Sequence, residues 1–109
     1  MIALLKENLA ELTNLCRRFG IGKLDVFGSA ATGAYIHGKS DIDFVIEFVD
    51  EDPVIANHLF DFAESAEMLL GTRVDIIFES GMTNPYLRYA VNQTREAIFD
   101  ERPNRQTAA

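Results

Sequence analysis

The sequence predicts a small α+β (α/β) domain, with a mixed β-sheet of three to four strands flanked by helices. In some segments apolar residues recur at three- and four-residue steps, which is typical of helices that bury one face. In others they alternate at every second residue, which is typical of strands. The segments follow one another as helix, strand, strand, helix, strand, helix, with a last short strand near the end.

The N-terminal segment predicts one amphipathic helix between about residues 2 and 19. Its apolar stripe consists of Ile2, Leu5, Leu9, Leu12, Cys16 and Phe19. Gly20 and Gly22 are expected to end this helix, because glycine most easily adopts the left-handed conformation that follows a helix. A short strand is expected from Leu24 to Phe27.

The second predicted strand, from Asp41 to Phe48, alternates cleanly between apolar and other residues. Its core side is formed by Ile42, Phe44, Ile46 and Phe48. A helix is expected to begin at Asp52-Pro53, since an aspartate can cap the first turn and proline suits the first helical position. Gly71 is expected to close that helix.

The C-terminal third predicts a strand, a helix and a last strand. Arg73 to Phe78 is the third strand, with Asp75 on the side away from Val74 and Ile76. The dipeptide Asn84-Pro85 is a second helix start. Ala97 to Phe99 is the last strand candidate.

Length and composition restrict the classes of protein to which this chain can belong. Its 109 residues, 48% of them apolar, suit one domain at residues 1–101 and a flexible tail at residues 102–109. A net charge of -7 argues against non-specific nucleic-acid binding, which needs many basic residues. The single cysteine, the lack of a signal peptide and the lack of a long apolar segment predict a cytoplasmic protein without a membrane span.

Asp41 and Asp43 place two negative charges close together on one predicted strand, so a positive charge is needed to neutralise them. Residues two apart on a strand point to the same side, so the two carboxylates project side by side and raise each other's pKa. No Lys or Arg shares that strand face, so we expect a cation such as Mg²⁺, which is often held by one or two carboxylates plus substrate phosphates. Asp75 would join them if the two strands are neighbours. The alternative is that the acids merely begin an exposed strand.

Gly28 and Ser29 directly follow the first predicted strand. Glycine lets the backbone turn tightly and exposes N–H groups beside the serine hydroxyl, which makes a small anion-binding concavity. A helix starting through Ala30 and Ala31 would aim its positive end at the same point. Taken alone, the pair is better explained as an ordinary strand-to-helix turn capped by serine.

In combination these residues predict a site for a nucleoside triphosphate. Ser29 and nearby amides would hold the phosphates, and Asp41 and Asp43 would hold the Mg²⁺ that bridges them. Asp75 would serve a second metal ion or an acceptor hydroxyl, as two-metal nucleotidyl transfer requires.

Three stretches of the chain carry a resemblance to a known family: FGSAATG (Phe27 to Gly33), SDIDFVIEF (Ser40 to Phe48) and GTRVDIIF (Gly71 to Phe78). The chain resembles the minimal nucleotidyltransferase (MNT) family of the DNA polymerase beta-like nucleotidyltransferase superfamily. The resemblance covers about residues 2 to 100 and implies the nucleotidyltransferase fold.

The resemblance also implies roles for five residues. Gly28 and Ser29 fall on the family's nucleotide-binding pair, Asp41 and Asp43 on its metal-binding pair, and Asp75 on its third carboxylate. The three aspartates are therefore expected to be both metal ligands and catalytic residues. Two Mg²⁺ ions are implied, with Mn²⁺ able to substitute.

Members of this family are typically encoded beside a small helical HEPN protein and act as its antitoxin, and some transfer AMP from ATP to a tyrosine of that partner. The resemblance therefore implies a metal-dependent protein adenylyltransferase of the EC 2.7.7 type. It implies that the chain binds ATP and forms a hetero-oligomer with a HEPN-type protein.

Two departures from the family pattern keep an alternative open. Many members carry an arginine just before the glycine that corresponds to Gly33, where this chain has Ala31 and Thr32, and only Lys39 or Lys23 would remain as cations for the triphosphate. The 11 residues between Ser29 and Asp41 are one more than in many relatives. The alternative is a weak or inactive antitoxin that neutralises its partner by binding alone. A small-molecule nucleotidyltransferase is the third hypothesis, although such enzymes usually add a helical domain for the acceptor.

Overall fold

A computed structural model describes residues 1–49 and 58–102 of the chain. Four strands, β1 (Ile21–Phe27), β2 (Ile42–Phe48), β3 (Val74–Phe78) and β4 (Glu96–Asp100), form one sheet in the order β3-β2-β1-β4. The helices are α1 (Ala3–Glu7), α2 (Leu9–Arg18), α3 (Ser29–Thr32), α4 (His58–Leu70), the 3-10 helix η2 (Glu79–Gly81) and α5 (Pro85–Thr94). The predicted α+β class and its four-stranded mixed sheet are confirmed.

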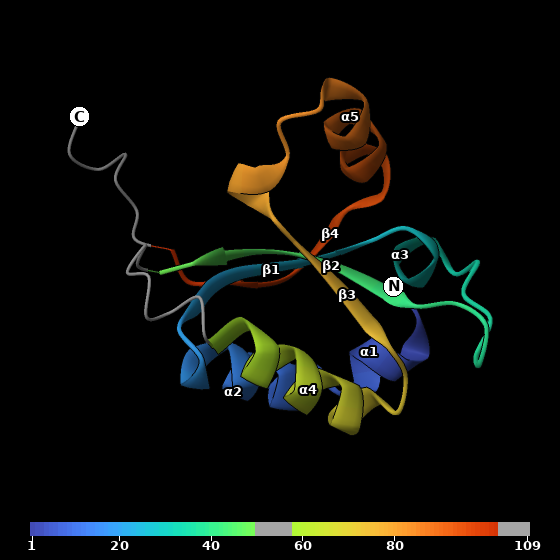
Figure 1. Cartoon of the computed structure of the whole chain (residues 1–109). Helices are drawn as coiled ribbons and strands as arrows, with labels where there is room; N and C mark the ends of the chain where they lie inside the picture. Colours follow the sequence, from blue (N-terminus) through green and yellow to red (C-terminus); the bar gives the residue numbers. More distant parts are fainter. Residues whose placement is uncertain (50–57, 103–109) are drawn as a thin grey trace.

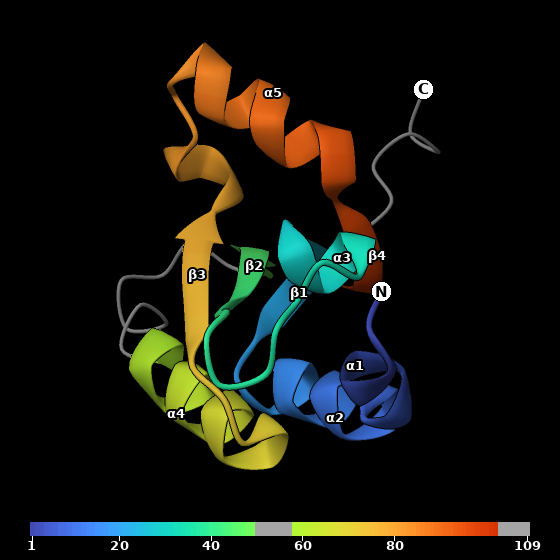
Figure 2. The same cartoon turned by 90° about the vertical axis from the view of Figure 1, so that its right-hand side faces the viewer.

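The sheet separates two groups of helices. Figure 1 shows α1, α2 and α4 together on one face, and α5 with the 3-10 helix on the opposite face. Seen from the side in Figure 2, α3 lies at one end of the sheet, beside the end of β1. The face under α5 is the one that carries Asp43, Val45 and Glu47, so both faces of the sheet are covered in part.

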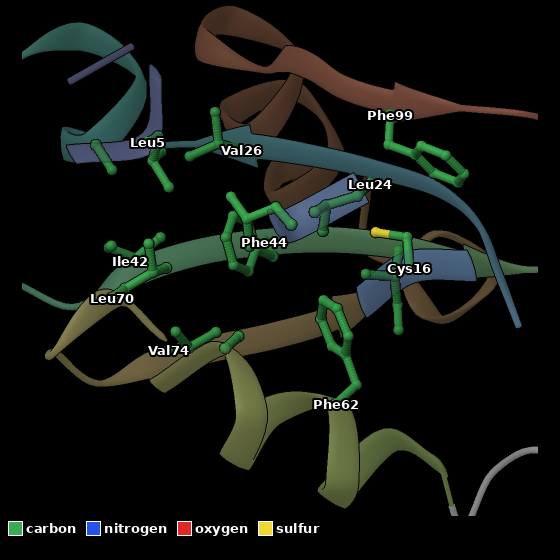
Figure 3. Packing of buried hydrophobic residues seen from close by; sticks show 14 of the residues in the cluster. Leu5, Cys16, Leu24, Val26, Ile42, Phe44, Phe62, Leu70, Val74 and Phe99 are labelled. Carbon is green, nitrogen blue, oxygen red and sulfur yellow. The ribbon is translucent and has the colours of Figure 1, made fainter. Parts of the chain in front are cut away.

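The main hydrophobic core fills the space between the sheet and the α1, α2 and α4 layer (Figure 3). The apolar side of β2 contributes Ile42, Phe44 and Ile46, which are all buried, as the alternation predicts. The helices contribute Leu5, Leu12, Cys16, Phe62, Ala66 and Leu70. Burial raises the pKa of the Cys16 thiol to about 12, because the thiolate would lose its hydration in the core.

A second, smaller core lies under α5 on the other face. Val45, Met82 and Val91 are buried there, with Phe27 and Ile77 packed against them. Val91 is the only residue of α5 that is buried, so this helix covers the sheet thinly. The side chain of Asn84 accepts hydrogen bonds from the amides of Tyr86 and Leu87, which confirms the predicted cap.

The structure corrects the prediction of one continuous N-terminal helix. The chain breaks at Asn8, which separates α1 from α2. Asn8 turns its side-chain amide back to the carbonyl oxygen of Leu4 at 2.8 Å, and its own N–H donates to Leu5 three residues earlier. A polar side chain that competes for helix carbonyls in this way explains the break.

Other boundaries differ by a few residues. β1 begins at Ile21, three residues before the predicted start, so Gly22 lies inside a strand rather than after a helix. Gly20 does adopt the left-handed region, with a φ of 74°. The predicted helix start at Asp52-Pro53 lies outside the described residues, as do residues 103–109 of the predicted tail. Arg102, also placed in that tail, forms ion pairs with Asp100 and Glu47.

Strand pairing decides which residues share one end of the sheet. β1 runs antiparallel to both β2 and β4, whereas β2 and β3 are parallel. Phe27 at the end of β1 pairs with Asp43 of β2, and Asp43 pairs in turn with Asp75 of β3. A single row across the sheet therefore joins the Gly28 turn to two of the predicted site residues.

Candidate active site

Asp43 and Asp75 lie side by side on the face of the sheet that α5 partly covers. They are register partners on neighbouring parallel strands, and paired residues of a sheet project to the same side. Asp43 is half-buried and Asp75 is exposed. The condition under which Asp75 would join the other two aspartates, that the second and third predicted strands are neighbours, is therefore met.

The environment of Asp43 opposes its ionisation. Partial burial raises the pKa of its carboxyl group above the ordinary value, and the negative charges of Asp75 and then Asp41 raise it further. The three aspartates are thus close enough to act on one another electrostatically. A cation bound among them would reverse this effect.

Asp41 forms an ion pair with a residue that the sequence analysis did not count. The Nε of Arg73 lies 3.1 Å from Oδ1 of Asp41, and the Arg73 side chain is 80% exposed. No Lys or Arg lies on that face of β2 itself, as the sequence analysis noted, but Arg73 reaches Asp41 from the position just before β3. Among the described residues, no three His, Cys, Asp or Glu side chains are already arranged to hold a metal ion.

The donor set still suits a hard cation. Mg²⁺ prefers oxygen ligands and commonly takes only one or two carboxylates from the protein, with phosphates and water completing its shell. Asp43 and Asp75 supply two adjacent carboxylates, and Asp41 could join them if its weak, exposed ion pair with Arg73 opened.

The turn at Gly28 comes into direct contact with this carboxylate pair. Gly28 has a φ of 70° and a ψ of -147°, a region that is essentially restricted to glycine. A Cβ atom placed on Gly28 would lie 2.9 Å from Oδ2 of Asp43. Glycine is therefore required here for both its backbone conformation and its lack of a side chain.

Ser29 begins the predicted helix, which is confirmed but is only one turn long. The half-buried Ser29 opens α3, in which the amides of Ala31 and Thr32 already donate to the carbonyl oxygen of Gly28. The Gly28 amide is already engaged, because it donates to the side-chain oxygen of Thr94 at 2.9 Å. The Ser29 hydroxyl and the first two amides of α3, rather than the Gly28 N–H, are thus the donors that this turn can offer to an anion.

A hollow of about 210 Å³ adjoins the site on the Asp41 side. It is lined on the loop side by His37 and Lys39 and on the strand side by Arg73. Lys39 therefore lies near the carboxylates, as the sequence analysis allowed. Lys23 does not, because it forms an ion pair with Asp25 at 3.4 Å farther along β1.

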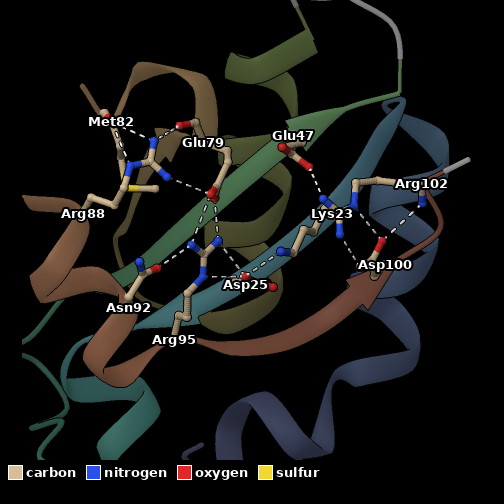
Figure 4. A network of polar contacts seen from close by, with 10 residues as sticks. All are labelled: Lys23, Asp25, Glu47, Glu79, Met82, Arg88, Asn92, Arg95, Asp100 and Arg102. Atoms are coloured by element: carbon tan, nitrogen blue, oxygen red, sulfur yellow. Dashed lines mark hydrogen bonds and ion pairs between the residues drawn. The ribbon is translucent and has the colours of Figure 1, made fainter. Parts of the chain in front are cut away.

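The sequence analysis missed a network of charged residues on the same face of the sheet (Figure 4). Asp25 is only 3% exposed, and Arg95 lies 2.8 Å from its Oδ2 and 2.5 Å from Oε2 of Glu79. These bonds with Arg95 lower the pKa of Glu79. A charged residue between Leu24 and Val26 in an apolar strand was the available signal for this network.

Other candidates fall outside the site or on its edge. Tyr86 and Tyr89 are 85% and 67% exposed on α5. Within the described ranges, none of the helices is long and apolar enough to cross a membrane.

Comparison with known proteins adds independent evidence. The model of the nucleotidyltransferase domain family matches residues 12–103. The protein adenylyltransferase MntA of Thermococcus cleftensis is 34% identical over 94 residues, which cover 83% of this chain and 85% of that protein.

Two solved structures resemble the chain along most of its length. One is a minimal nucleotidyltransferase with a TM-score of 0.69 and 33% identity, covering 87% of this chain and 95% of that one. The other belongs to the complex of a tri-AMPylated Shewanella oneidensis HEPN toxin with MNT antitoxin. Its TM-score is 0.58 at 17% identity, and the match covers 87% of this chain and 71% of that one. At this identity the likeness supports the fold alone. The family match over most of the chain and the shared sheet establish that this protein belongs to the nucleotidyltransferase domain family, among the minimal nucleotidyltransferases, and is a nucleotidyltransferase.

Proposed function

We propose that this chain transfers AMP from ATP to a hydroxyl group, a tyrosine, of a helical HEPN-type partner, and that it is the antitoxin of a toxin–antitoxin pair. The observation that carries the proposal is the row in which the Gly28 turn, Asp43 and Asp75 meet at one end of the sheet. The adenylyltransferase relative described above supports the choice of AMP, and the HEPN partner is taken from the complex whose MNT antitoxin shares this fold. We place this activity in the cytoplasm, a reducing compartment that suits the free thiol of Cys16.

In this proposal Asp43 and Asp75, joined by Asp41, would hold two Mg²⁺ ions. When bound, these ions would neutralise the triphosphate charge and favour attack at phosphorus. The Ser29 hydroxyl and the first amides of α3 orient the phosphate chain by donating hydrogen bonds to it. Arg73 and Lys39 line the same hollow as Asp41. Their positive charges can compensate for the family arginine, which is replaced by Thr32 in this chain.

The reaction follows from this arrangement. The acceptor oxygen forms a bond to the α-phosphorus of ATP, the bond from that phosphorus to the bridging oxygen breaks, and pyrophosphate leaves. Asp75, the exposed member of the pair, is placed to accept the proton that the hydroxyl loses.

The test is transfer of label from ATP to the partner. The chain is co-purified with the helical protein encoded beside it and incubated with Mg²⁺ and ATP labelled at either the α- or the γ-phosphate. Only the α-label should reach the partner, and mass spectrometry should locate AMP on a tyrosine. Asp43→Asn and Asp75→Asn should abolish labelling, whereas Asp61→Asn, on the exposed side of α4, should leave it intact.

The second candidate is an antitoxin that acts by binding alone. The absence of a cation at Thr32 and the engagement of Asp41 by Arg73 favour it, because both weaken nucleotide or metal binding. Two results together would establish this candidate and contradict the first: the Asp43→Asn variant still neutralises the toxin, and the partner in the complex carries no label from ATP.

A further inference from the structure

Thr94, the last residue of α5, touches the turn that faces the phosphates. The amide of Gly28 donates to the Thr94 side-chain oxygen at 2.9 Å, across 66 residues of sequence. The contact is partly buried, so losing it would leave the Gly28 amide without an equivalent partner. Thr94 therefore connects the end of α5 to the turn that follows β1.

Gly28 has little room to move relative to Asp43. The clearance between the Gly28 backbone and Oδ2 of Asp43 is too small for even one added carbon, which would lie 2.9 Å from that oxygen. A displacement of the turn by a few tenths of an ångström would alter the spacing between the phosphate donors at Ser29 and the carboxylate.

Thr94 is itself held in place by the residue that follows it. The Nε of Arg95 donates a hydrogen bond to Oδ2 of Asp25 at 2.9 Å, and its Nη1 donates one to the side-chain oxygen of Asn92 at 2.9 Å. Arg95 also forms an ion pair with Glu79 (Figure 4). The backbone amide of Arg95 also donates to the carbonyl oxygen of Val91. The end of α5 is thus attached both to β1 and to the segment that follows β3.

We infer that Thr94 is a positioning residue for nucleotide binding: through Gly28 it sets the distance between the Ser29 donors and the Asp43 carboxylate. This inference rests on the proposed nucleotide site and adds a residue outside its motifs. Thr94 does not touch the nucleotide. It acts by occupying the Gly28 amide, so the first two amides of α3 and the Ser29 hydroxyl carry the contacts to phosphate.

Two substitutions of Thr94 separate the hydrogen bond from the shape of the side chain. Thr94→Val keeps the shape and removes the acceptor, whereas Thr94→Ser keeps the acceptor. Thr13→Val is the matched control, because Thr13 is a half-buried threonine on α2, on the far side of the sheet. ATP binding in Mg²⁺ is measured by calorimetry on the chain without its acceptor partner.

We expect Thr94→Val to weaken ATP binding about tenfold, the factor associated with one net hydrogen bond. Thr94→Ser should stay within about twofold of the unchanged chain, and so should Thr13→Val. In transfer assays the KM for ATP should rise more than kcat falls, because the acceptor side of the site is not altered.

Hydrogen exchange at the Gly28 amide provides a second measurement that needs no nucleotide. The amide should be protected in the unchanged chain and in Thr94→Ser, and should exchange faster in Thr94→Val while amides of α2 stay protected. An unprotected Gly28 amide in the unchanged chain overturns the inference even if Thr94→Val does not fold.

The outcomes separate this inference from the proposed function. Equal ATP affinity of Thr94→Val and the unchanged chain, or an equal loss in Thr94→Ser, overturns the role of Thr94 and leaves the proposed function standing. Failure of the unchanged chain to bind ATP at all contradicts the proposed function itself, and with it any positioning role for Thr94.

Discussion

Gly28 and Asp43 are in such close contact that a Cβ atom on Gly28 would lie 2.9 Å from Oδ2 of Asp43. The turn after β1 and the carboxylate on β2 therefore lie side by side, although they are 15 positions apart in the sequence. A nucleotide whose phosphates lie on the turn would be within reach of any cation held by that carboxylate.

Gly28→Ala should lower the free energy of unfolding more than the same substitution at another glycine. Gly20 provides the control, because its φ of 74° is close to the 70° of Gly28 but an added Cβ would meet nothing within 4 Å. We expect Gly20→Ala to lower the free energy of unfolding by about 1 kcal/mol and Gly28→Ala by roughly 3 kcal/mol, since the latter adds a steric clash in a backbone region that is essentially restricted to glycine. Chemical denaturation measures both. Equal losses would mean that Asp43 moves aside freely.

Asp43→Asn should stabilise the chain at neutral pH while removing its metal binding. The native pKa of Asp43 is raised, so the native state binds this proton more tightly than the unfolded state, and the free energy of unfolding falls as pH rises through the raised pKa. The amide removes this penalty. Thermal unfolding in EDTA at pH 7 should show an increase in Tm of about 2 °C, because the group is partly solvated.

The benefit of Asp43→Asn should disappear at a pH below the ordinary Asp pKa, where both forms of the chain are uncharged at this position. A stabilisation that persisted unchanged in acid would point to packing rather than to charge repulsion.

Arg73→Gln should raise the affinity for divalent cations in the absence of nucleotide. Arg73 competes with a metal ion for Asp41 and adds a positive charge beside the site. Because its side chain is exposed, the effect should be small, about threefold in the Kd for Mn²⁺ by calorimetry or spin-relaxation titration. Arg17→Gln is the control, since Arg17 pairs with Glu101 away from the site.

The same Arg73→Gln variant tests the role of Arg73 toward phosphate. If Arg73 compensates for the arginine missing at Thr32, the affinity for ATP should fall while the affinity for Mn²⁺ alone rises. A parallel fall of both affinities would contradict competition between Arg73 and the metal ion.

Arg95→Met should destabilise the fold by about 3 kcal/mol, because it leaves the buried Asp25 with only Lys23 as an ionic partner. The control is Arg102→Met, which breaks more exposed ion pairs with Asp100 and Glu47 and should cost at most about 1 kcal/mol. Urea denaturation at pH 7 compares the two variants.

Acid provides a further check on Arg95. The native pKa of Glu79 is lowered, mainly by its bonds with Arg95, so its contribution to stability is present above the ordinary Glu pKa and is lost as pH falls below it. Stability should therefore depend less on pH in this range in Arg95→Met than in the unchanged chain. An identical acid profile would mean that Arg95 does not govern Glu79.

Much of the fold could be predicted because periodicity is a local property of the chain. The alternation in β2, the apolar stripe of α4 and the Asn84-Pro85 start of α5 each depend on residues within one or two turns. The break at Asn8 was not predictable from the stripe alone, since Leu5 and Leu9 satisfy the helical spacing on both sides of it. One side-chain hydrogen bond decided it.

The sequence by itself determined that Asp41 and Asp43 share one side of a strand and that Gly28-Ser29 follows another, since strand geometry and glycine conformation require no distant partner. Only the tertiary structure decided that Asp75 lies beside Asp43, that Arg73 rather than a third carboxylate contacts Asp41, and that Thr94 holds the Gly28 amide. These contacts join residues 32 to 66 positions apart, and strand order and register, which no local pattern encodes, bring them together.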